Sequence, residues 1–184
     1  MAVSVRAHSS SASNQRAGII ARTITLIVAT LCAVASCSTR IESDAGGRIS
    51  AVVTQVIDGD TVQVSIGGRT QDIRLIGVDT PETVHPTKPV QCFGPEASQH
   101  TKQLLPRGTR VYLARDIESR DKYGRLLAYV YRSADNLFVN HELVFNGWAR
   151  PYPYPPNTTL DSTFAEAAFH AQSQQLGLWR YCGR

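Results

Sequence analysis

Residues 49–78 read ISAVVTQVIDGDTVQVSIGGRTQDIRLIGV, and this stretch decides the fold class. It contains three runs rich in apolar and β-branched residues, at 49–57, 61–66 and 69–78. Asp58-Gly59-Asp60 separates the first two runs, and Gly67-Gly68 separates the second from the third. Both breaks are typical of tight turns between antiparallel strands. The stretch therefore predicts a three-stranded meander.

The residues that follow predict two more strands and three helices. The strands are expected over 109–116 and 126–132, and the helices over 94–105, 137–146 and 160–175, each helix ending at a breaker: Pro106, Gly147 and Gly177. Proline-containing loops are expected over 81–93 and 151–157. Five short strands with three helices predict an α+β, mostly β, domain. This set of elements favours a small closed barrel, and the five-stranded OB type is the natural candidate.

The first 36 residues do not fit this domain and resemble an export signal. Residues 1–22 contain arginines and no acid, and residues 23–36 form a short apolar run, which together are typical of a signal peptide. The run ends Val34-Ala35-Ser36-Cys37, a lipobox-like sequence that predicts acylation of Cys37. Ala33-Val34-Ala35 offers ordinary cleavage as the alternative. Residues 37–48 are expected to be a tether, and residues 49–184 the folded domain.

The cysteines favour the lipobox over ordinary cleavage. The chain has four: Cys32, Cys37, Cys92 and Cys182. Removal of Cys32 with the signal and acylation of Cys37 leave an even pair, whereas ordinary cleavage leaves an odd thiol in an oxidising compartment. We therefore expect the protein on the outer face of a bacterial cytoplasmic membrane, held only by the lipid, or otherwise secreted.

The net charge of the chain gives no independent argument for nucleic-acid binding. The whole chain has 19 basic and 15 acidic residues, a formal net charge of +4. Three of the arginines, Arg6, Arg16 and Arg22, lie in the export signal, so the mature domain carries 16 − 15 = +1. A nucleic-acid site must therefore be local.

Acids and arginines gather at the strand ends and loops of the predicted domain. Asp60 and Asp79 end or follow strands of one meander, where two carboxylates, a carbonyl and water suit Ca²⁺. Arg74 and Arg125 can hold phosphate oxygens, and Glu82 can deprotonate a water molecule. Each has a simpler explanation as a turn, a surface ion pair or a helix cap. Together they predict metal-assisted phosphodiester hydrolysis.

Four segments carrying these residues resemble the staphylococcal nuclease family in order and spacing, from about Ile49 to Trp179. They are 56–62, 74–83 with its VDTPET stretch, 121–129 with its DKYGR stretch, and 152–157. The resemblance implies a five-stranded OB-type barrel with three helices. It also implies a calcium-dependent endonuclease that acts on DNA or RNA and leaves 3′-phosphates. The alternative is an inactive nucleic-acid- or protein-binding module of the cell envelope.

The resemblance also implies a role for each matching position. Asp60, Asp79 and the carbonyl of Thr80 correspond to the Ca²⁺ ligands, Arg74 and Arg125 to the arginines on the scissile phosphate, and Glu82 to the general base. Lys122 and Tyr123 match residues at the terminal phosphate of the nucleotide, and Tyr152 and Tyr154 match the aromatic residues beside the base. We expect a monomer, since nothing in the sequence suggests an oligomer.

Three features depart from the best-known member of that family. The connection between Ala114 and Asp121 is shorter, and Arg150-Pro151 precedes the tyrosines. Cys92 and Cys182 are additional. One precedes the first helix and the other follows the last, and free thiols are uncommon outside the cytoplasm. We therefore predict a disulfide between them.

Overall fold

The computed structural model describes residues 47–84, 87 and 89–183, all of which lie in the second of two compact units, 39–184. The signal peptide, Cys37 and nearly all of the tether lie outside the described residues. Within the described ranges, no helix is both long enough and apolar enough to span a bilayer.

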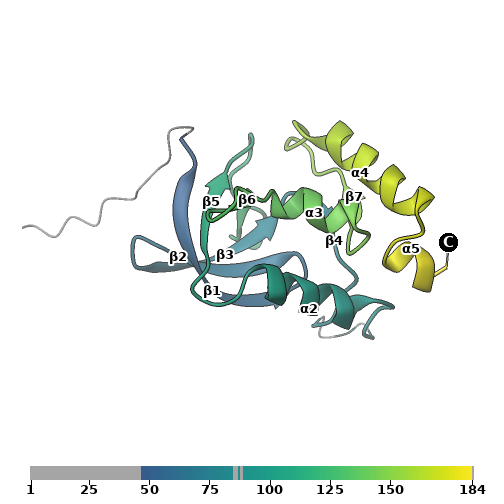
Figure 1. Cartoon of the computed structure of the whole chain (residues 1–184). Coiled ribbons are helices and arrows are strands. Elements are labelled where there is room, and N and C mark those ends of the chain that lie inside the picture. Colours follow the sequence, from purple (N-terminus) through teal and green to yellow (C-terminus); the bar gives the residue numbers. More distant parts are fainter. Residues whose placement is uncertain (1–46, 85–86, 88, 184) are drawn as a thin grey trace, which may run out of the picture. The chain divides into compact units, whose positions relative to one another are not determined.

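Five strands close into a barrel, which confirms the predicted fold (Figure 1). The barrel strands are β1 (Ile49–Asp58), β2 (Thr61–Ile66), β3 (Arg69–Leu75), β5 (Arg110–Ala114) and β6 (Leu126–Arg132). Their order is β1-β2-β3-β6-β5, antiparallel at each junction except β3–β6. Inward-facing side chains alternate with outward-facing ones and fill the centre with valine, isoleucine and leucine.

The predicted C-terminal end of the third strand is wrong. It was expected to run to Val78, but β3 stops at Leu75, and β4 (Gly77–Asp79) pairs instead with β7 (Arg150–Tyr152). Gly77 permits the change of direction because its φ is +77°, which residues with a Cβ rarely adopt, and a Cβ there would clash with the Phe164 ring. The predicted loop 151–157 therefore begins as an edge strand, where Pro151 is tolerated.

The helices cover the barrel and position the loops at one of its ends. The three predicted helices are shorter than expected, and a fourth short one was not predicted: α2 (Gly94–Leu104), α3 (Val139–Phe145), α4 (Asp161–Ser173) and α5 (Leu178–Tyr181). The Thr101 hydroxyl of α2 donates to the Gly59 carbonyl at 2.8 Å, so α2 is tied to the β1–β2 turn. The structure joins Cys92, before α2, to Cys182, after α5, with their Cα atoms 5.7 Å apart.

Candidate active site

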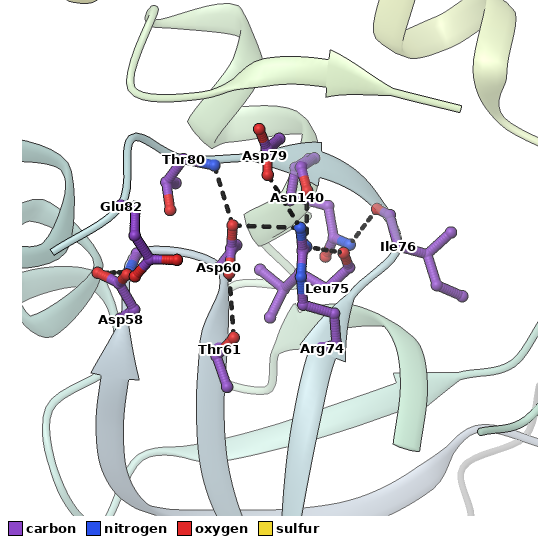
Figure 2. A network of polar contacts seen from close by, with 12 residues as sticks. Asp58, Asp60, Thr61, Arg74, Leu75, Ile76, Asp79, Thr80, Glu82 and Asn140 are labelled. Carbon is purple, nitrogen blue, oxygen red and sulfur yellow. Dashed lines mark hydrogen bonds and ion pairs between the residues drawn. The ribbon is translucent and has the colours of Figure 1, made fainter. Parts of the chain in front are cut away.

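Arg74, on β3, lies between two carboxylates that come from separate connections. Its Nη2 is 3.3 Å from Asp60 Oδ2 and 3.2 Å from Asp79 Oδ1. Its Nη1 donates to the carbonyls of Leu75 at 2.8 Å and Val78 at 2.6 Å. Figure 2 shows the guanidinium group held between these partners. The break between β3 and β4 thus creates the carbonyl arrangement that orients Arg74.

Asp60 connects the β1–β2 turn to the end of β4. Its side chain is buried; Oδ1 accepts from the Thr61 hydroxyl at 3.0 Å, and Oδ2 accepts from the Thr80 N–H at 3.0 Å. Asp79, the residue before Thr80, is half exposed. Burial of its inner side and repulsion from Asp60 raise the pKa of Asp79, and Arg74 only partly offsets them. Two negative charges are therefore held close together at the barrel end.

This donor set fits a hard divalent cation. Carboxylate oxygens are the ligands that Ca²⁺ prefers, and the repulsion that raises the pKa of Asp79 is the kind that a cation relieves. The Thr80 hydroxyl is buried and has no hydrogen-bond partner among the described residues. No three His, Cys, Asp or Glu side chains of the described residues are assembled to hold a metal by themselves. Backbone carbonyl and water oxygens would therefore have to complete the coordination.

Glu82 lies on the opposite side of Asp60 from Arg74 (Figure 2). Its Oε1 accepts from the N–H groups of Thr83 at 3.1 Å and Val84 at 3.0 Å. Burial acts to raise the pKa of Glu82, but the hydrogen bond from Val84 and one with Asp58 outweigh it, so the pKa is lowered. Glu82 is therefore kept ionised, as a proton acceptor must be.

Arg125 lies at the start of β6 and is oriented by Asp121. Its Nε donates to Asp121 Oδ2 at 2.6 Å, while Asp121 Oδ1 accepts from the N–H groups of Tyr123 and Arg125, both at 3.0 Å. No hydrogen bond to the terminal Nη atoms of Arg125 occurs within the part of the chain that the structure describes. The two Nη groups of Arg125 can therefore bind a phosphate bidentately.

Two adjoining cavities bring together all ten predicted metal, catalytic and substrate-binding residues. The first, which we call the outer cavity, has a volume of about 490 Å³ and is lined by Lys122, Tyr123, Tyr152 and Tyr154. The other, of about 480 Å³, is lined by Asp60, Thr80 and Glu82. Arg74, Asp79, Tyr123 and Arg125 line both the outer cavity and this inner one. A chain of phosphates and bases laid across the two would place a phosphate at the arginines and a base beside the tyrosines.

Sequence reasoning missed four residues that hold the site through hydrogen bonds, three of which, Asp58, Gln91 and Asp121, also line the cavities. Asp58, read only as part of a turn, is buried; it accepts from the Thr83 hydroxyl at 2.6 Å and the Thr83 N–H at 3.2 Å. Burial raises the pKa of Asp58. Asp121 was within a quoted motif but was given no role. For Gln91 and Asn140 no local signal existed, because their partners are distant in sequence.

The fold and the site together define a class: an OB-type barrel that carries, at one end, two arginines and three acids around two adjoining cavities. Residues 72–181 match the family model described as "Staphylococcal nuclease homologue", and the chain belongs to that family.

Its relatives agree with this assignment. The chain is 47% identical over 130 residues to a Thermonuclease of Staphylococcus intermedius, covering 71% of this chain and 76% of the relative. It is 42% identical over 127 residues to a Thermonuclease of Staphylococcus hyicus, covering 69% and 73%. It is 38% identical over 136 residues to Endonuclease YncB of Bacillus subtilis, covering 73% and 64%.

Proposed function

We propose that this protein is a calcium-dependent endonuclease that hydrolyses phosphodiester bonds in DNA and RNA. Its membership of a family whose relatives bear the names Thermonuclease and Endonuclease supports a nuclease that hydrolyses phosphodiester bonds. The single observation that carries the proposal is the convergence of Arg74, Arg125, Asp60, Asp79 and Glu82 around adjoining cavities. All of them come from one chain, so we propose that it acts as a monomer.

The side chains divide the work of hydrolysis. Glu82 accepts a proton from the attacking water, and the water oxygen bonds to phosphorus. Arg74 and Arg125 stabilise the negative charge that grows on the phosphate oxygens. The bond between phosphorus and the 5′ oxygen breaks, that oxygen takes a proton from solvent and leaves as a 5′-hydroxyl, and the phosphate stays on the 3′ side. A bound Ca²⁺, held by Asp60, Asp79 and the Thr80 carbonyl, would polarise the phosphate.

The outer cavity binds the nucleotide next to that phosphate. Lys122 and Tyr123 contact its terminal phosphate, and Tyr152 and Tyr154 lie beside its base. Stacking on tyrosine accepts any base and favours single-stranded substrate. The two tyrosine rings, with centroids 6.4 Å apart, support this assignment. Broad base specificity follows.

The test is the removal of each arginine. Arg74→Ala and Arg125→Ala should each lower kcat by roughly a hundredfold or more, the scale of losing one preorganised donor to a developing charge. Arg132→Ala is the matched control, because Arg132 is also bound to an acid, Asp135, but lies outside both cavities. Cleavage of DNA and of RNA is measured with Ca²⁺ and with EDTA. Full activity in a folded Arg74 or Arg125 variant contradicts the mechanism.

The same assay separates an enzyme from a binding module. Wild-type protein that binds an oligonucleotide but does not cleave it in Ca²⁺ would support the inactive module. Product analysis then tests the polarity, because a 3′-phosphate and a 5′-hydroxyl are expected at each cut.

We further propose export and anchoring by a lipid on Cys37. The disulfide supports export, because such bonds persist in oxidising compartments. Metabolic labelling with a fatty acid should mark the wild type and not Cys37→Ser. An unlabelled mature protein that starts after Ala35 would instead indicate ordinary signal cleavage.

A further inference from the structure

Gln91 holds the backbone of Glu82 on both sides. The Gln91 side-chain oxygen accepts from the Glu82 N–H at 3.0 Å, and the Gln91 N–H donates to the Glu82 carbonyl at 2.9 Å. Gln91 itself lines the inner cavity. These two hydrogen bonds join the ends of the connection between β4 and α2. They fix the peptide units from which the Glu82 carboxylate projects.

The residue after Gln91 is covalently tied to the C-terminal segment. Cys92 forms the disulfide with Cys182, a residue 90 positions later. Phe93, at φ +66°, stacks on Trp148 with ring centroids 5.2 Å apart and on Tyr181 at 5.7 Å. A non-glycine residue at positive φ is uncommon and persists only where its surroundings hold it. The disulfide, this ring stack and the hydrogen bond from the Gly94 N–H to the Gln91 carbonyl, at 3.0 Å, together constrain the position of Gln91.

We propose that Gln91 is a positioning residue for Glu82, and that the Cys92–Cys182 disulfide sets its position, so that hydrolysis depends on oxidation of this pair. The inference rests on the proposed function of Glu82. It goes beyond that function because it makes the activity responsive to redox conditions: low in a reducing compartment, full after export.

The covalent step is ordinary thiol–disulfide exchange. One thiolate of a dithiol reductant attacks a sulfur of the disulfide and forms a mixed disulfide, releasing the other cysteine as a thiol. The second thiol of the reductant, as a thiolate, attacks the reductant's own sulfur in the mixed disulfide. This forms a disulfide within the reductant and releases the remaining cysteine as a thiol. Two electrons and two protons pass to the protein, and the reductant becomes a disulfide. Cys92 is exposed and so open to attack.

Reduction of the disulfide should loosen the segment that contains Gln91 and Cys92 without unfolding the neighbouring helices. Helix α5 stays docked, because Leu178 is buried and its N–H donates to the Gly147 carbonyl at 2.8 Å. The Phe93 ring stack also remains. Arg74 lies on β3, Arg125 immediately before β6 and Tyr152 on β7, all outside the segments that the disulfide joins. Catalysis should therefore suffer while substrate binding does not.

The experiment compares oxidised and dithiol-reduced full-length mature protein on a single-stranded oligonucleotide in Ca²⁺. Displacement of a catalytic group by about an ångström can cost up to about a hundredfold, so kcat should fall by roughly tenfold or more on reduction. KM, and the Kd for an uncleavable phosphorothioate oligonucleotide, should change by less than about twofold, within the span expected for one weak contact. Cys92→Ser/Cys182→Ser should match the reduced wild type and should not respond to the dithiol.

Gln91→Met tests the same link with the disulfide intact. It keeps the length of the side chain and removes the acceptor, so kcat should fall with KM unchanged, and the fall should not add to that caused by reduction. Val111→Ala, in the β5 core, controls for lost stability: at a temperature where it is folded, kcat should stay at the wild-type value.

The outcomes separate this inference from the proposed function. Inactive oxidised wild type would remove the proposed function and this inference with it. Active oxidised wild type whose kcat is unchanged on reduction, or unchanged in Gln91→Met, would overturn this inference alone. A loss that falls on KM instead of kcat would also overturn it.

Discussion

The two arginines at the site are held in different ways, and this assigns them different tasks. The Arg74 guanidinium is occupied by two carbonyls and two carboxylates, so its position is fixed and its charge is partly neutralised. Arg125 is held through Nε alone by Asp121. Both arginines line the two cavities, but no hydrogen bond to the Nη atoms of Arg125 occurs among the described residues, so we propose that Arg125 binds the phosphate more directly and that Arg74 also organises the acids.

Asp121→Asn should impair catalysis although it leaves both arginines of the site unsubstituted. Asparagine keeps an acceptor for the Tyr123 and Arg125 N–H groups, but its amide cannot replace the charged acceptor at Arg125 Nε. The Arg125 fork then loses its fixed orientation, and kcat should fall about tenfold or more. Steady-state kinetics measures it, with Asp135→Asn as control, because that also breaks an Arg–Asp pair, Arg132–Asp135, at 2.6 Å. Equal effects of the two substitutions would contradict the assigned role of Asp121.

At the scale of elements, the site depends on the point where the chain leaves β3 and enters β4. Asn140 of α3 is fully buried there. Its Nδ2 donates to the Ile76 carbonyl at 2.9 Å, and its Oδ1 accepts from the Val130 N–H at 2.8 Å. Helix α3 thus supplies hydrogen bonds that a continuous β3 strand would have made with a neighbouring strand. Asp79, three residues beyond Ile76, is positioned as a result.

Asn140→Ala should cost both stability and activity. It leaves two buried backbone groups without partners, a loss of about 2–4 kcal/mol in the free energy of unfolding. Urea denaturation measures this. Asn146→Ala, at the C-cap of the same helix, where the side chain is bonded only to Glu142, should cost about 1 kcal/mol or less. The kcat of Asn140→Ala should also fall under conditions where the protein is folded; unchanged kcat would show that Asp79 does not depend on this contact.

The elements that the sequence predicted are those with local signals. Asp58-Gly59-Asp60 and Gly67-Gly68 mark their turns by themselves, so the meander was predicted closely. The break at Ile76 was missed because its cause, Asn140, lies 64 residues away. The role of Asp58 was missed for the same reason, since its partner Thr83 lies 25 residues further on. Resemblance to a family identified the residues of the site, but it could not show which neighbours hold them.

At the scale of the whole domain, a disulfide closes residues 92–182 into one loop. For the separation of 90 residues between Cys92 and Cys182, the chain-entropy model gives on the order of 4 kcal/mol of stabilisation. Cys92→Ser/Cys182→Ser should therefore unfold at a lower temperature than oxidised wild type, in thermal scans followed by circular dichroism. Reduced wild type should coincide with the variant. A melting temperature that is the same with and without the bond would show that the C-terminal segment does not restrain the unfolded chain.

The barrel and the last long helix are joined at Asp116, and this makes the stability of the domain depend on pH. Asp116 follows β5; its Oδ2 accepts from the Tyr129 hydroxyl at 2.8 Å, and its Oδ1 accepts from the Thr159 hydroxyl, just before α4, at 2.8 Å. Burial acts to raise the pKa of Asp116, but these hydrogen bonds outweigh it, so the pKa lies below its ordinary value. Burial and the same bond raise the pKa of Tyr129, which keeps the phenol protonated as the donor.

A depressed carboxyl pKa contributes stability that is present above the pKa of the unfolded chain, about 3.9, and is lost as the pH falls through the lower value of the folded protein. Asp116→Asn should therefore be less stable than the wild type at pH 7, with the difference shrinking as the pH falls below about 4. Urea denaturation between pH 7 and pH 2 measures both curves. Glu166→Gln, an exposed acid on α4, controls for the loss of one negative charge. A difference between Asp116→Asn and wild type that stays constant across this range would show that the ionised carboxylate is not what joins the barrel to α4.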